Sequence, residues 1–480
     1  MVRFSIKNLI SAPERSISEI IVAKKFQPVI LVALVLIFAS IFVSSYRIAY
    51  VEDDNSIFSL TRKSDFEDYY LASQTISRGG DPYKIENIKS IKKQFEWKDV
   101  ADPMKIRDFL KSVRGVGTYL YPPFTAFLLL PLSGFSYSAA TLIFQTLSIL
   151  AFLMFLLVIY YFTDRNNLLH HFFLPMLVTS LMMYTFLNGN FLHGNILTFL
   201  LLLTAGGIYL SFRDEKFLNL AGGFLIGLAV IIKITPIFFG LVLFGKKRFT
   251  AIFGMGLGAM AGLALPALYT GYEENLILLQ NWYDLILGNY GKQGIVRAWA
   301  NNQSFSAMIG KLFLPGSDSG QAAYGLPLFG EASKLSVEKS FFYASVARYA
   351  NILFLASGIS ISFYRMIRNL KRENHFDLEA MRLLYFSTIL SLLTSGVSWY
   401  HAFGALFFPV FLRLNRHYQG EKLLFGEKLG YYLISVFGFF HLFMSGFLKE
   451  VLALYSIFTL FCVGIAVYTA YLLVSEKNGI

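Results

Sequence analysis

Long apolar segments separated by short polar or basic ones run through most of the chain. A helix needs about 20 apolar residues to cross a bilayer, and most of these segments approach that length. The shortest are 235–245 and 400–413, which leaves broken or re-entrant helices as alternatives to complete crossings there. The pattern predicts about twelve membrane-spanning segments, near residues 26–46, 137–163, 170–187, 195–212, 219–232, 235–245, 251–269, 341–364, 381–396, 400–413, 428–446 and 451–474.

The composition supports this prediction. Hydrophobic residues make up 55% of the chain, charged residues only 15%, and the mean hydropathy is +0.55. An ordinary soluble domain has about 25% charged residues. We therefore expect an all-α polytopic membrane protein. The single cysteine, Cys462, lies in an apolar segment, which excludes an internal disulfide framework and a cysteine metal cluster. We expect no metal and no cofactor.

The net charge of +12 is distributed as membrane topology requires. With a cytoplasmic N-terminus, the inner segments carry 21 Lys or Arg against 11 Asp or Glu, and the short outer connections at 188–194 and 397–399 carry no Lys or Arg. This is the positive-inside bias. We therefore read the charge as a topology signal and expect no nucleic-acid partner. Residues 1–25 are predicted to form an amphipathic segment on the cytoplasmic surface, and an even number of crossings returns the C-terminus to the same side.

Two long connections, 47–136 and 270–340, are predicted on the outer side. They divide a transmembrane core, 26–415, which precedes a C-terminal transmembrane pair at 416–480. The first connection contains SDFEDYYLASQTISRGGDPY, Ser64 to Tyr83, which predicts a short surface helix that ends at its Gly-Gly-Asp-Pro sequence. Asp65 and Tyr69 are four residues apart and share a face of that helix. A helix in or dipping into the outer leaflet is expected within 113–135.

Ionisable groups at membrane depth are costly, so they are functional candidates. Lys233 lies in an apolar segment three residues before Pro236. It either binds an anion such as a phosphate, or pairs with a carboxylate or reaches the interface. His401 lies at the outer end of a short segment, where it either donates to a phosphate or shuttles a proton, or is structural. Asp65 is the candidate carboxylate, with Glu67 and Asp68 as competitors.

Side-chain amides and a second histidine gather in the outer turns. His193 lies among Asn188, Asn190 and Asn195, and the second long connection contains Asn302 and Gln303. Amides suit the hydroxyls of a sugar, although Asn and Gly also form turns. Both interpretations remain open for these residues.

The motifs that carry these residues follow one another in an order that resembles glycosyltransferase family 87. This family belongs to the GT-C superfamily and includes polyprenyl-phosphomannose-dependent α-mannosyltransferases. The resemblance spans roughly residues 26–415 and rests on Asp65-x-x-x-Tyr69, Gly80-Asp81-Pro82-Tyr83, Tyr121-Pro122-Pro123, the turn at 188–190, Gly227-Leu-Ala-x-x-x-Lys233-x-x-Pro236, Asn302-Gln303-Ser304 and Ser398-Trp399-x-His401.

The resemblance implies a GT-C-type bundle whose long outer loops carry juxtamembrane helices. It also implies an inverting enzyme that moves a sugar, such as mannose, from a polyprenyl phosphate to a lipid or glycan acceptor. Asp65 would be the general base, and His401 a second catalytic residue near the donor phosphate. The implied substrate-binding residues are Tyr69, Tyr121, Asn190, His193, Lys233, Asn302, Gln303 and Trp399. Where many relatives have Gly-Gln, this chain has Gly189-Asn190, which shortens the reach of the amide.

The implied location is the bacterial inner membrane, with the site facing the periplasm or the cell exterior. Two other functions remain open from the residues. The broken segments around Pro236 and the intramembrane Lys233 are also compatible with a transporter or flippase of lipid-linked sugars. A polysaccharide polymerase or ligase of similar topology is the other, with Arg297 as a candidate residue in its outer loop.

Overall fold

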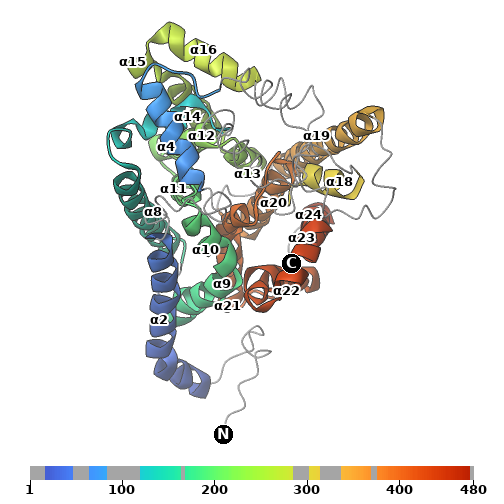
Figure 1. Cartoon of the computed structure of the whole chain (residues 1–480). Coiled ribbons are helices and arrows are strands. Elements are labelled where there is room, and N and C mark those ends of the chain that lie inside the picture. The colour runs from blue at the N-terminus through green and yellow to red at the C-terminus, as the bar shows by residue number, and fades with distance from the viewer. Residues whose placement is uncertain are drawn as a thin grey trace.

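The protein is a bundle of helices (Figure 1). The computed structural model describes residues 17–46, 64–83, 119–163, 168–284, 302–313, 337–368 and 376–475. Every regular element in these segments is helical, and the only extended pairing among them is an isolated bridge between Asn302 and Trp399. The predicted all-α class is confirmed.

Several helices are long and apolar enough to cross a membrane. Within the described residues there are five such helices, or six if one bent pair forms a single crossing. The five lie in α2 (Ile17–Ser45), α8 (Tyr137–Tyr160), α14 (Phe249–Ala264) with α15 (Ala267–Thr270), α19 (Val337–Arg368) and α24 (Ile457–Ser475). The bent pair joins α9 (Leu174–Met182) to α10 (Tyr184–Leu192) at 68° and follows the π-helical turn η5 (Leu169–Phe173). These helices mark the chain as a membrane protein.

The remaining helices of the bundle are shorter. They are α11 (Leu197–Ser211), α12 (Lys216–Ile232), α13 (Phe239–Gly245), α20 (Leu378–Thr394), α21 (Phe407–Tyr418) and α22 (Phe425–Gly438). Both of the shortest predicted segments begin in a 3₁₀ turn, η6 (Thr235–Phe238) and η10 (Tyr400–Leu406). Pro236 accounts for the first turn, since it has no N–H for an α-helical bond. Because of such interruptions, about twelve crossings stays a prediction.

The predicted span at 451–474 is wrong in its boundaries. α23 (Gly446–Leu454) ends inside this predicted span, and α24 begins only at Ile457. The backbone turns between them at Ser456, whose φ of +52° lies in the left-handed region. Apolar residues continue through this turn, so hydropathy alone does not reveal it. The crossing helix is therefore α24, and α23 is a separate element.

Small residues bring α12 and α14 into backbone contact. A Cβ on Gly223 would lie 1.8 Å from the carbonyl oxygen of Ala251, and one on Gly254 would lie 2.1 Å from that of Leu220. Glycine is required where two helices approach this closely, as is common inside membranes. This contact fixes α12, which ends at Lys233.

The C-terminal helices hold η10 through aromatic packing. The ring of Phe458 in α24 lies 4.7 Å from that of Phe403 in η10 and 4.6 Å from that of Phe437 in α22. Phe403 and Phe458 are fully buried. The position of η10 therefore depends on α24, far along the chain.

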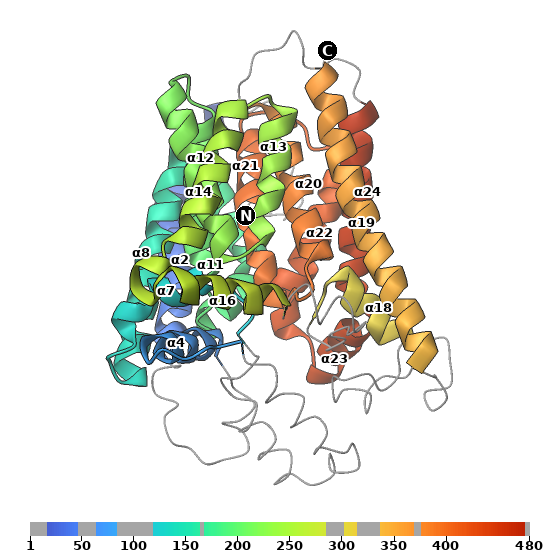
Figure 2. The ribbon, with the colours of Figure 1, turned by 90° about the horizontal axis from the view of Figure 1, so that it is seen from above.

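Short helices lie across one end of the bundle (Figure 2). α4 (Asp65–Ser77) confirms the surface helix predicted between Ser64 and Tyr83. The segment expected to form a helix within 113–135 contains α7 (Pro123–Leu128) and η3 (Leu130–Leu132) in its described part. The others at this end are α16 (Tyr272–Tyr283), α18 (Phe305–Phe313) and α23, which follows η11 (Phe440–Phe443).

Candidate active site

The candidate site begins at the first residue of α4. The Ser64 hydroxyl accepts a hydrogen bond from the backbone N–H of Glu67 at 3.1 Å and caps the helix, which fixes Asp65 in the first turn. The backbone N–H of Asp65 donates to the carbonyl of His193 at 2.7 Å. The helix start is thus attached to the turn after α10.

Two polar side chains from distant parts of the sequence meet at Asp65. The Asn195 amide Nδ2 donates to Asp65 Oδ2 at 2.6 Å, and His401 Nε2 lies 3.3 Å from the same oxygen. Asn195 Nδ2 also lies 3.3 Å from His401 Nε2. The Asp65 side chain is 27% exposed and that of His401 only 9%. The carboxylate is therefore the more exposed of the two groups, and the imidazole is buried.

The surroundings of Asp65 stabilise its ionised form. Burial favours the neutral acid, but the hydrogen bond and positive charge of His401 oppose this, with smaller contributions from His193 and Asn195. Together they hold the pKa of the Asp65 carboxyl well below its usual value. Asp65 is therefore an anion across the physiological pH range. The exposed ring of His193 lies 5.2 Å from that of His401.

A wall of tyrosines forms one side of the site. The Tyr69 hydroxyl donates to that of Tyr121 at 3.0 Å, and the two rings meet edge to face at 4.9 Å. The Tyr83 hydroxyl donates to the backbone carbonyl of Tyr121 at 2.6 Å. Burial raises the pKa of the Tyr69 and Tyr121 phenols above the usual value, so both remain neutral hydrogen-bond donors. Tyr121 is thereby held against the face that Asp65 and Tyr69 share.

Lys233 lies on the other side of Tyr121, where its ammonium is 6.0 Å from the centre of the ring. Its backbone leaves the helix in an extended conformation, and the Thr125 hydroxyl donates to the preceding carbonyl, of Ile232, at 3.0 Å. Within the described residues, no carboxylate lies within ion-pair distance of Lys233. This leaves Lys233 available for an anionic ligand.

Gly189 and Asn190 lie behind the turn that carries His193. A Cβ on Gly189 would lie 3.2 Å from the Cβ of His401, so a larger residue here would require His401 to shift by a few tenths of an ångström. Asn190 is 1% exposed, and its carbonyl accepts the backbone N–H of Asn195 at 3.0 Å. In this conformation Asn190 is buried and supports the turn, and its side chain does not lie on the exposed side of Asp65.

Asn302 and Gln303 hold the segment that leads to His401. Asn302 Oδ1 accepts the backbone N–H of Ser398 at 2.8 Å, and its Nδ2 donates to the carbonyl of Gly396 at 3.1 Å. The backbone N–H of Gln303 donates to the carbonyl of Ser398 at 2.7 Å. Both Asn302 and Gln303 are fully buried, which gives them a positioning role here. Trp399, partly buried, pairs with Asn302 through the isolated bridge.

Three further residues of this region were not predicted as site residues from the sequence. In the sequence Asn195 is one of several amides in the outer turns, although it is the one that bridges Asp65 and His401. Lys311 donates to the carbonyls of Asn302 and Ala453, both at 2.8 Å, and so ties the Asn302 turn to α23. Asn281 donates to Asp81 at 2.6 Å and joins α16 to the segment after α4. Each of these bonds links distant segments, so no local sequence signal reveals it.

The described residues of this region do not include a set of side chains that would bind a metal ion. Among the residues that the structure describes, no group of three or more His, Cys, Asp or Glu side chains could hold a metal ion. The polar groups here are instead a carboxylate, an imidazole, an amide and a lysine. They suit proton transfer and the binding of an anion.

The fold and this site define the class: a helical membrane protein with a candidate acid–base site at one end of its bundle. The sequence pattern of glycosyltransferase family 87 matches residues 119–395, more than half of the chain. The chain belongs to this family and is a glycosyltransferase, as the motifs predicted. No curated protein and no solved structure shows significant similarity to the chain. The match includes Tyr121 and Lys233, whereas Asp65 and His401 lie outside it.

Proposed function

We propose that the protein is an inverting glycosyltransferase that moves a hexose, such as mannose, from a polyprenyl phosphate to a lipid or glycan acceptor. Asp65 is the general base. The reaction takes place at the outer face of the membrane, in bacteria the periplasmic face of the inner membrane. The observation that carries the proposal is the partly exposed Asp65 carboxylate, which lies between the His401 imidazole and the tyrosine wall next to Lys233.

The bond changes follow from these groups. The acceptor hydroxyl oxygen attacks the anomeric carbon while the bond from that carbon to the phosphate oxygen breaks, and the hydroxyl proton moves to Asp65. The low pKa of Asp65 makes it a weak base towards a free hydroxyl. The hydroxyl becomes much more acidic as its oxygen bonds to the sugar, so the proton transfers late in the step. A single base is sufficient for inversion, in contrast to the two carboxyl groups of glycosidases.

Lys233 and His401 stabilise the leaving phosphate in this proposal. A phosphate ester gains negative charge as the sugar departs, and cationic or N–H donors placed beside it lower the barrier. Lys233 has no carboxylate partner in the described part of the chain. Tyr69, Tyr121, His193 and Trp399 surround the sugar, and Asn190, Asn302 and Gln303 support these groups from behind. A donor that arrives through the bilayer accounts for the absence of any nucleotide-binding sheet among the described elements.

The test is the substitution Asp65→Asn in the purified full-length protein, assayed with a short-chain polyprenyl phosphomannose. The variant keeps the size of the side chain but has no basic oxygen, so turnover should fall by about 10²–10⁴-fold. Donor binding should survive, because the donor phosphate contacts other residues. Asp68→Asn, one turn along α4, is the matched control and should retain turnover. Unchanged turnover in Asp65→Asn would exclude Asp65 as the base.

A transporter or flippase of lipid-linked sugars is a second candidate, favoured by the bend of 68° between α9 and α10 and by the break at η6. Movement of an unmodified polyprenyl phosphomannose across reconstituted vesicles, without transfer of the sugar, would support it. The polymerase or ligase alternative rests on Arg297, which lies outside the described residues.

A further inference from the structure

A cluster of buried charges lies at the opposite end of the bundle from Asp65. Arg382 is in the first turns of α20, Arg413 is in α21 and Glu427 begins α22. α20 ends near Ser398, and α21 follows η10, which carries His401. At 1.5 Å per helical residue, both arginines lie roughly 20 Å from the candidate active site. The cluster is thus separate from the proposed catalytic groups.

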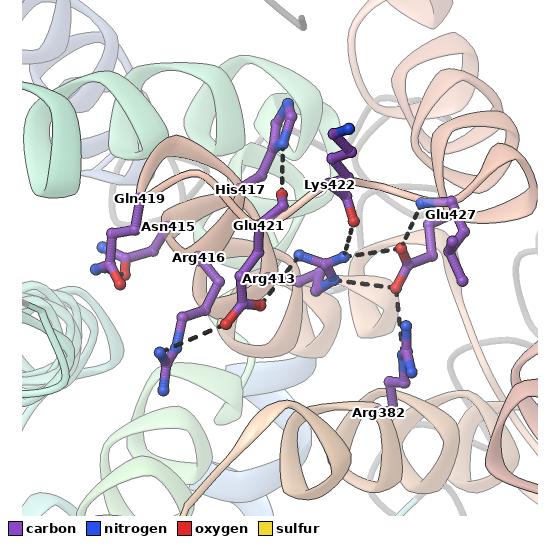
Figure 3. A network of polar contacts seen from close by, with 10 residues as sticks. Arg382, Arg413, Asn415, Arg416, His417, Gln419, Glu421, Lys422 and Glu427 are labelled. Carbon is purple, nitrogen blue, oxygen red and sulfur yellow. Dashed lines mark hydrogen bonds and ion pairs between the residues drawn. The ribbon is translucent and has the colours of Figure 1, made fainter. Parts of the chain in front are cut away.

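One carboxylate serves two guanidinium groups in this cluster (Figure 3). Arg413 binds Glu427 through two bonds, Nε to Oε1 at 3.0 Å and Nη2 to Oε2 at 2.9 Å. Glu427 also accepts the backbone N–H of Leu424 at 2.8 Å. Arg382 reaches the same carboxylate only at 3.5 Å. The cluster therefore has an excess of positive charge, and its carboxylate is already saturated by Arg413.

Two buried donors in the cluster have no hydrogen-bond acceptor among the described residues. One is Nη1 of Arg413, whose nearest carboxylate oxygen, on Glu421, is 3.8 Å away. The other is the Tyr385 hydroxyl. The side chain of Arg413 is 5% exposed, so bulk water does not solvate it. Buried donors are satisfied in nearly all proteins, which indicates that an acceptor from outside the chain binds here.

Arg413 and Tyr385 line one pocket. It lies between α20, α21, α22 and α24, and its polar side also includes Arg382 and the Glu427 carboxylate that Arg413 binds. The other side is apolar and includes Ile465 and Leu472 of α24. A site with guanidinium and hydroxyl donors on one side and apolar groups on the other fits a phosphate that is attached to a hydrocarbon.

We propose that this pocket is a phosphate-binding site. Arg382, Arg413 and Tyr385 hold the phosphate oxygens. The phosphate belongs either to the headgroup of an anionic membrane lipid or to free inorganic phosphate. Phosphate is favoured over a carboxylate because its oxygens accept from three donors at once, two on α20 and one on α21.

The experiment measures ligand binding to the purified full-length chain in detergent, by native mass spectrometry and by the shift in melting temperature. The probes are short-chain phosphatidic acid, diacylglycerol with the same chains, and inorganic phosphate. Phosphatidic acid that binds far more tightly than diacylglycerol supports a lipid headgroup, whereas tighter binding of inorganic phosphate assigns the site to the free ion. Equal binding of phosphatidic acid and diacylglycerol, with no binding of phosphate, would overturn the proposal.

The variant Tyr385→Phe tests the location. It removes one hydroxyl that makes no bond to the rest of the described chain, so the fold should be kept. The affinity for the phosphate-bearing probe should fall about five- to tenfold, the effect of one hydrogen bond. Arg382→Gln should reduce it at least tenfold. Tyr432→Phe, an exposed tyrosine of α22, is the matched control. Unchanged affinity in both Tyr385→Phe and Arg382→Gln would place the ligand elsewhere and overturn the assignment.

Discussion

The two ends of the bundle each hold buried ionisable groups, but in opposite arrangements. At one end a single carboxylate, Asp65, is partly exposed and is surrounded by an amide, an imidazole and a nearby lysine. At the other end two guanidinium groups share the carboxylate of Glu427, to which Arg413 donates two short hydrogen bonds. The first arrangement holds a reactive anion in place without neutralising it. The second joins three helices and leaves an excess of positive charge.

The difference separates the proposed catalytic groups from groups that stabilise the fold. The contacts of Asp65 are made by side chains of the turn after α10 and of a 3₁₀ segment, so their loss should leave the core of the bundle intact. Those of Arg413 join the ends of α20, α21 and α22, so their loss should loosen the core. Substitutions at the two ends should therefore have opposite effects. Asp65→Asn should lose activity and retain stability, whereas changes at Arg413 should lose stability and retain activity.

The largest effect on stability is expected for Arg413→Met. This change leaves Glu427 buried without its bidentate partner, which costs about 3–5 kcal/mol. The matched control is Arg416→Met, because Arg416 is 35% exposed and contacts Glu421 at only 3.5 Å, so that its loss should cost at most about 1 kcal/mol. Denaturation in mixed micelles measures both. Equal losses would show that the buried Arg413–Glu427 pair stabilises the fold no more than an exposed ion pair does.

A smaller effect, on activity alone, is expected for Lys233→Met. Removal of one cationic group beside the leaving phosphate typically lowers turnover by about 10²-fold. The melting temperature should change little, since Lys233 has no ion pair in the described residues. Lys216→Met, on the exposed first turn of the same helix, is the control. Normal turnover in Lys233→Met would remove Lys233 from the donor site.

His401→Gln should lower turnover about tenfold and also change its pH dependence. His401 helps to hold the pKa of Asp65 below its usual value, so its loss raises that pKa. Asp65 must be ionised to accept a proton. The acid side of the pH–rate profile should therefore move to higher pH in the variant, while Tyr184→Phe, a change away from Asp65, leaves it in place. If turnover falls at the same acidic pH in His401→Gln as in the unmodified protein, His401 does not lower the pKa of Asp65.

A last effect, on the pH dependence of stability, is expected at Lys311 in α18. Burial lowers the pKa of its ammonium from the usual 10.5 to about 7. Above pH 7 the folded chain then binds fewer protons at this residue than the unfolded chain, so its contribution to stability rises with pH, on the order of 1 kcal/mol per unit up to about pH 10. Lys311→Met should abolish this rise, and Lys428→Met, at an exposed position, should not. The same pH dependence in Lys311→Met would assign the rise to other groups.

Local patterns in the sequence were sufficient for much of the fold. The face shared by Asp65 and Tyr69 and the terminating Gly-Gly-Asp-Pro sequence predict α4, because both signals act over a few residues. The apolar segments likewise correspond to helices. The turn at Ser456 was missed because apolar residues continue through it.

The candidate site was predictable only in part. The ordered motifs point to Asp65, Lys233 and His401, which the fold brings into one region. They do not reveal that Asn302 and Gln303 are buried behind His401, since that depends on packing against α24. The pairing of Arg413 with Glu427 was not foreseen either. In the sequence these residues are only part of the segments that are predicted to carry the cytoplasmic excess of positive charge. Which way their side chains point depends on how three helices meet.

The attachment of η10 to α24 has a consequence for biosynthesis. Gln303 receives a hydrogen bond from Thr459 and donates to Ala453, and the same turn holds the segment before His401. The ribosome makes Asp65 long before α24. A nascent chain that has α4 but not yet α24 lacks the contacts that fix His401, so we expect the proposed site to remain incomplete until α24 has been made.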